Sequence, residues 1–113
     1  MSGKDAAIRN FQISRGLLNG RHKLSEVFSG LEYSPAIREL FSEDPSLDRL
    51  RRLDVEITDD ATYMRVRDLD GQLLINPHYL RRGRKEFIYL DLLHELTHIK
   101  QYWSGRELYD PRC

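Results

Sequence analysis

The 113-residue sequence predicts a single α+β domain with N-terminal helices, a small sheet and a long C-terminal helix. A serine or aspartate followed by proline, at Ser34-Pro35 and Asp44-Pro45, is a typical helix start. The alternating residues 54–58, and an Asp70-Gly71 pair between two strand-like runs, predict strands and a hairpin. The long, mainly apolar segment 86–103 predicts the final helix.

Helices account for the first half of the predicted fold. A loose apolar stripe predicts a helix over residues 5–18, which Asn19-Gly20 ends. A shorter helix is expected over 22–28. The two start signals then predict helices over 35–41 and 45–52, where apolar residues follow at helical spacing.

The sheet is expected between residues 54 and 76. Val55 and Ile57 alternate with polar residues and indicate a half-buried strand. A hairpin at about 62–76 follows, because Gly71 accepts the positive φ angle that a tight turn requires. We interpret residues 72–76 as an edge strand that can hold an extended peptide by main-chain hydrogen bonds.

The predicted helix 86–103 carries the most informative residues of the chain. Its apolar residues cover most of the helix circumference, so we expect it to be largely buried. The remaining stripe is polar and consists of Asp91, His94, Glu95, His98, Gln101 and Tyr102. A polar stripe on a buried helix needs partners, and a metal cleft would supply them.

The segment His94-Glu95-Leu96-Thr97-His98 has the HExxH spacing of zinc peptidases. Residues four apart lie on one helix face, so both imidazoles can bind one Zn²⁺, while Glu95 acts as general base toward a zinc-activated water. The competing interpretation is two histidines held by ordinary hydrogen bonds. Asp91, one turn before His94, can orient a ligand or face solvent.

A catalytic zinc site normally has three protein ligands and an open position for water. The candidates for the third ligand are His78, Glu107, Asp110 and Cys113. Each of them is more commonly an ordinary surface or turn residue. A thiolate of Cys113 has a second conceivable role, since it can fill the open position and block the water, within one chain or between two.

Composition excludes several other classes. Eighteen basic and eighteen acidic residues give no net charge, and no apolar run reaches the roughly 18 residues that cross a bilayer. We therefore expect no membrane and no nucleic-acid partner. A basic set can be read as a nucleic-acid surface but is better explained as a solvated face: Arg65, Arg67, Arg81, Arg82, Arg84 and Lys85. One cysteine and no secretory signal suit a cytoplasmic protein.

Residues 87–110, FIYLDLLHELTHIKQYWSGRELYD, resemble the minigluzincins, a family of small zinc metallopeptidases. The matches are HELTH, the following Gln101-Tyr102 and the tail 105–110, and the hairpin ending Ile75-Asn76-Pro77 is also similar. The resemblance implies a minimal zincin-like fold, zinc-dependent peptide hydrolysis, and self-association in which a C-terminal segment enters a neighbouring cleft.

Minigluzincins take their third zinc ligand from a glutamate on a helix after this tail. No residue of this chain matches that glutamate, so residues 1–113 are expected to form a minimal zincin-like domain without the downstream glutamate helix. The predicted function is a zinc metallopeptidase acting on peptides or unstructured proteins, latent or self-inhibited in this form. The alternative is an inactive zincin scaffold that binds a partner or oligomerises.

Overall fold

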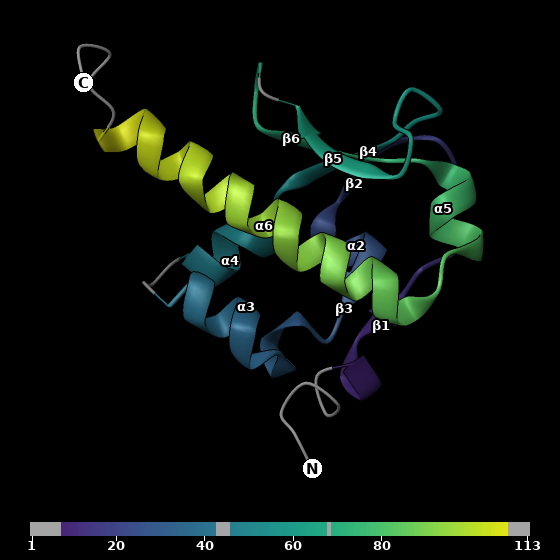
Figure 1. The fold of residues 1–113 in the computed structure, drawn as a ribbon, viewed down its shortest axis with the longest axis horizontal. Helices are drawn as coiled ribbons and strands as arrows, with labels where there is room; N and C mark the ends of the chain where they lie inside the picture. The colour runs from purple at the N-terminus through teal and green to yellow at the C-terminus, as the bar shows by residue number, and fades with distance from the viewer. Residues whose placement is uncertain (1–7, 43–45, 68, 109–113) are drawn as a thin grey trace.

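A four-stranded mixed sheet and a long helix that crosses in front of it dominate the structure (Figure 1). This computed structural model describes residues 8–42, 46–67 and 69–108. The described residues form a compact α+β domain, as the sequence predicts. No helix in these ranges is long and apolar enough to cross a membrane.

The N-terminal segment contains short strands where helices were expected. Residues 8–10 are helical, and the next elements are β1 (Gln12–Ile13), β2 (Gly20–Lys23), α2 (Leu24–Val27), β3 (Phe28–Ser29) and the 3₁₀ turn η1 (Leu31–Tyr33). The predicted helix over 5–18 is therefore wrong from Phe11 onward, and residues 5–7 lie outside the described ranges. Of the predicted helix over 22–28, only Leu24–Val27 is helical.

Long-range pairing explains both errors. Strand β1 pairs antiparallel with β3, and this brings Phe11 onto Phe28, with ring centroids 5.3 Å apart. Strand β2 pairs antiparallel with β4 (Asp54–Ile57), which satisfies backbone groups that a helix would otherwise pair locally. Tertiary partners thus override the weak helical pattern of this segment.

Helices α3 (Pro35–Leu40) and α4 (Ser46–Arg51) confirm the predictions for 35–41 and 45–52. The Ser34 side chain caps α3 by accepting from the Ile37 N–H. The same buried hydroxyl is hydrogen-bonded to the Tyr89 hydroxyl of the C-terminal helix, so the cap also joins two helices. The Asp44-Pro45 start signal lies outside the described residues.

The predicted strand and hairpin are confirmed as β4, β5 (Met64–Arg67) and β6 (Gln72–Ile75). The strand order is β2-β4-β6-β5, with β4 parallel to β6 and the other pairs antiparallel. Strand β6 therefore lies inside the sheet, and the expectation that residues 72–76 form an edge is wrong. Of the two hairpin strands, β5 is the one that lies at the edge of the sheet.

Two helices follow the sheet. Helix α5 (Pro77–Arg82) was not expected. The Asn76 side chain caps it by accepting from the N–H groups of His78 and Tyr79, and Pro77 occupies its first turn. Helix α6 (Lys85–Leu108) is the predicted motif helix, and it continues beyond the expected stop at Ser104-Gly105.

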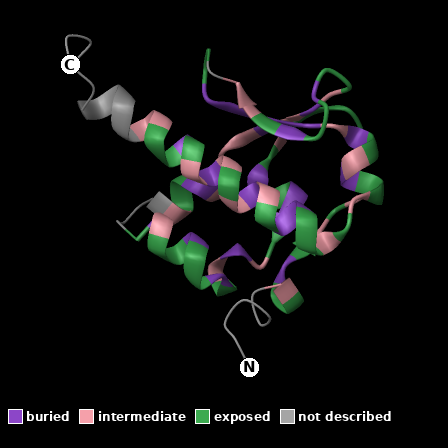
Figure 2. Ribbon diagram, in the orientation of Figure 1, coloured by how far each residue is buried: buried purple, intermediate pink, exposed green. Residues whose placement is uncertain are grey.

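Helix α6 packs on the sheet through one stripe only. Its fully buried side chains are Ile88, Leu92, Leu96 and Ile99, and they join a core that contains Val55, Ile57, Leu73 and Ile75 of the sheet. Phe87 is 55 % exposed and Leu90 is 43 % exposed. The expectation of a largely buried helix is therefore wrong, because exposed residues alternate with buried and intermediate ones along α6 (Figure 2).

The hairpin turn contacts α6 closely. Gly71 has a φ angle of +69°, and a Cβ atom built there would lie 2.6 Å from the Tyr102 ring.

We expect Gly71→Ala to lower the free energy of unfolding by about 1–2 kcal/mol, through backbone strain and displacement of that ring. Urea denaturation measures the change. Gly16→Ala is the control, since nothing lies within 4 Å of its Cβ, and an equal loss there would contradict this account.

Candidate metal centre

His94 and His98 lie side by side on the exposed face of α6. Their Nε2 atoms are 3.2 Å apart and their ring planes are nearly perpendicular, at 88°. The one-turn spacing brings them together, as predicted, and both residues are exposed. Without a metal this contact is a hydrogen bond in which one ring donates and the other accepts.

The distance between the two nitrogens fits a shared zinc ion. Two nitrogens bound at about 2.0–2.1 Å to a tetrahedral zinc lie about 3.3–3.4 Å apart. The observed 3.2 Å is close to that value. Neutral imidazole nitrogen is also a good zinc ligand, so His94 and His98 can serve as two ligands of a Zn²⁺ ion with little rearrangement.

Glu95 points toward the sheet. Its Oε1 accepts a hydrogen bond of 3.1 Å from the Val66 N–H on strand β5. Glu95 lies about 100° around the helix from His94, which turns the carboxylate from the solvent face toward this strand. All three side chains therefore come from α6, but the imidazoles face solvent and the carboxylate lies between α6 and β5.

Strand β5 presents an open edge at this point. Tyr63 C=O accepts from the Asn76 N–H, so Tyr63, Arg65 and Arg67 form the pairs that are hydrogen-bonded to the neighbouring strand. By alternation, the N–H and C=O groups of Met64 and Val66 point away from β6. Glu95 accepts from one of these outward N–H groups. No sequence pattern indicated Val66, because its role depends on which strand is the edge.

Asp91 is engaged by α5 and does not contact the histidines. The Tyr79 hydroxyl donates to Asp91 Oδ2, and the Tyr79 ring packs edge-on against Tyr63 at 5.3 Å. Burial, followed by the hydrogen bond to the Asp91 carboxylate, raises the pKa of the Tyr79 phenol above its ordinary value. Asp91 therefore holds α5 against α6. The cap signal at Asn76-Pro77 could have predicted α5.

The side chains that the structure describes bring no third ligand to the histidine pair. Among the side chains it describes, those of residues 8–42, 47–67 and 69–103, no three His, Cys, Asp or Glu groups form a metal cluster. His78 is exposed on α5 and belongs to no such group. The Glu107 side chain, Asp110 and Cys113 lie outside these ranges, so those three predictions stay open.

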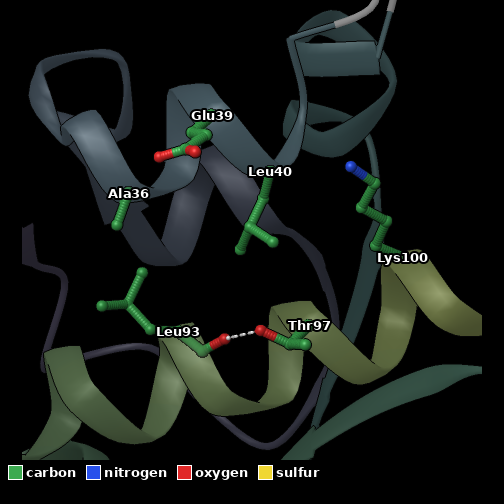
Figure 3. A pocket seen from close by; sticks show the side chains of 6 residues that line it. All are labelled: Ala36, Glu39, Leu40, Leu93, Thr97 and Lys100. Carbon is green, nitrogen blue, oxygen red and sulfur yellow. Dashed lines mark hydrogen bonds between the residues drawn. The ribbon is translucent and has the colours of Figure 1, made fainter.

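A groove runs beside α6 between this helix and α3. Its volume is about 440 Å³, and it is lined by Ala36, Glu39, Leu40, Leu93, Thr97 and Lys100 (Figure 3). Leu93 lies roughly half a turn around α6 from Glu95. The groove therefore follows the flank of the helix away from β5, and neither histidine lines it.

Part of the basic set is neutralised by local partners. Arg67 makes a two-pronged contact with Asp70, and this hydrogen bond raises the Arg67 pKa and lowers that of Asp70. Arg84 forms an ion pair with Glu86 and lies over the Phe87 ring. Two of the six basic residues, Arg67 and Arg84, therefore have acidic partners nearby, and the interpretation of the set as a solvated face stays a prediction.

No protein-family model, curated protein or solved structure matches this chain.

We expect Tyr79→Phe to lower the free energy of unfolding by about 1.5–3 kcal/mol, because it removes a hydrogen bond to a partly buried carboxylate. The raised folded pKa means that this contribution is present up to about pH 10 and declines above it, as the unfolded phenol ionises. Urea titrations at pH 7 and above pH 10 test this. Tyr63→Phe is the matched control, because it removes a hydroxyl from the neighbouring ring and leaves the Tyr79–Asp91 hydrogen bond in place; an equal loss there would contradict the role of that hydrogen bond.

Proposed function

We propose that this protein is a zinc-dependent metallopeptidase of the minimal zincin type. The observation that carries the proposal is the arrangement of HExxH around an open strand: two exposed imidazoles 3.2 Å apart, and a carboxylate that reaches the free edge of β5. A peptidase needs these three functions together, namely a metal, a base and a strand that can align an extended substrate.

His94 and His98 would hold the zinc ion. When bound, zinc would lower the pKa of a water and polarise the carbonyl of the scissile peptide. Glu95 would accept a proton from the attacking water at its carboxylate and deliver it to the leaving amine. Tyr79 and Asp91 would keep the first turns of α6 fixed against α5, so that His94 keeps its position.

The substrate would be an extended peptide or an unstructured protein lying along β5. The outward N–H and C=O groups of Met64 and Val66 are those that an added strand would pair with. A peptide carbonyl at Val66 would compete with Glu95 for the same N–H. Substrate binding would therefore release the Glu95 carboxylate at the moment when a base is needed.

One observation favours a second function, a non-catalytic scaffold that binds a partner or oligomerises. The described side chains supply two zinc ligands and no third. An ion held by two histidines alone binds weakly and lacks the fixed open site of a peptidase. Zinc content and turnover separate the two functions, since the scaffold would have no turnover of any unstructured substrate.

We expect zinc-loaded protein to cleave an unfolded protein such as casein, and a chelator to abolish this activity. Glu95→Gln should lower the rate by about 10²–10⁴-fold while zinc content is unchanged, because glutamine keeps an acceptor for the Val66 N–H but cannot take a proton. Fluorescent casein fragments measure the rate and mass spectrometry of the metal measures zinc. Full activity of Glu95→Gln would refute Glu95 as the base.

The edge of β5 is tested by Val66→Pro, which removes the outward N–H. Proline is tolerated on an edge strand where the N–H is not part of the ladder. We expect the KM for peptides to rise by up to about tenfold with zinc content unchanged, because the peptide loses one main-chain hydrogen bond, an effect that is partly offset since it no longer has to displace Glu95. Val66→Ala is the matched control because it trims the side chain and keeps the N–H. A similar rise in KM for Val66→Ala would contradict pairing at this N–H.

A further inference from the structure

The face of α6 that carries His94 and His98 has features that a peptidase site does not explain. Phe87 and Leu90, two large apolar side chains, are 55 % and 43 % exposed. They lie on the same side of the helix as His94, His98 and the exposed Gln101, within about 80° of one another around its axis. Figures 1 and 2 show this helix in front of the sheet, with exposed residues along it.

The histidine pair is half of a tetrahedral donor set. Zinc in closed sites takes four protein ligands, and the described side chains of this chain bring two. A second copy related by a two-fold axis carries an identical pair at the same 3.2 Å spacing. Two such pairs facing each other supply four imidazole nitrogens around one ion.

We infer that a zinc ion bridges two copies of this chain through His94 and His98 of each. The two α6 helices then face each other, antiparallel, across a two-fold axis near Leu96. This inference rests on the same two ligands as the proposed function. An ion bound by four histidines has no position left for water, so the dimer is a latent form and the ion in it is structural.

The composition of the face suits this contact. In an antiparallel pair centred near residue 96, Leu90 lies six residues before the axis and Tyr102 six residues after it. Leu90 of one copy therefore lies opposite the region of Gln101 and Tyr102 of the other. The exposed residues around the histidines, Phe87, Leu90 and Gln101, are all uncharged, so two copies approach without like-charge repulsion there.

The test is the oligomeric state of the full chain as a function of zinc. Metal-free protein is titrated with zinc chloride in a reducing buffer, which prevents a disulfide through Cys113. Light scattering after size exclusion gives the mass, and metal analysis gives the stoichiometry. We expect a monomer without zinc, a dimer with one zinc per two chains, and return to monomer with a chelator. His94→Ala and His98→Ala, both at exposed positions, should stay monomeric at all zinc concentrations.

Two further variants separate the contact surface from the ligands. Leu90→Lys keeps both histidines and adds a positive charge to each copy, so the dimer should require about tenfold more protein at saturating zinc. His78→Ala removes an exposed histidine on α5 and should dimerise like the wild type. Circular dichroism confirms that each variant is folded.

The outcomes distinguish this inference from the proposed function. A monomer that holds one zinc per chain overturns the dimer and leaves the peptidase proposal standing, with a third ligand from the chain itself. Loss of zinc in His78→Ala overturns the dimer in favour of His78. A dimer that persists with chelator and in His98→Ala shows a contact without bridging zinc. Absence of zinc binding overturns both proposals.

Discussion

The burial of one apolar stripe of α6 against the sheet determines the orientation of everything else in the site. Ile88, Leu92, Leu96 and Ile99 are fully buried, and each such side chain stabilises the fold by about 1.5–3 kcal/mol. This fixes the rotation of the helix about its own axis. The same rotation directs His94 and His98 to solvent and Glu95 to the β5 edge. A rotation of α6 by one residue, about 100°, would turn Glu95 away from the β5 edge and the histidines away from their present positions.

The helix is held in this orientation by polar contacts on separate sides. The buried Ser34 hydroxyl joins α3 to Tyr89, near the beginning of α6, and Tyr79 joins α5 to Asp91. Glu95 joins the middle of the helix to β5. The first two contacts are structural and leave the imidazoles free. The third uses the base itself, so the geometry of the strand edge and the availability of the base are linked.

The features that short local motifs specify could be predicted from the sequence. The features that depend on the order of the strands in the sheet could not. Ser34-Pro35, Asp70-Gly71 and the HExxH spacing are local signals, and the helix, the turn and the histidine pair they predict are present. The strands β1 and β2 were missed because their backbone partners lie far along the chain. The edge was misplaced because no local pattern shows that β4 pairs with β6. Tyr79 was missed together with α5.

The Glu95 contact also has a consequence for how the protein behaves at high concentration. An uncovered strand edge is a template for pairing with another chain and thus for aggregation. The Glu95 carboxylate accepts from one of the outward donors of β5, the Val66 N–H, and the charged residues Arg65 and Arg67 stand on either side of Val66 in the strand. Replacing Glu95 with alanine would therefore leave the Val66 N–H unpaired on an edge strand, where another chain can pair with it, and would also remove the base. Insolubility of that variant would reflect the strand and not the chemistry, whereas glutamine keeps the edge covered.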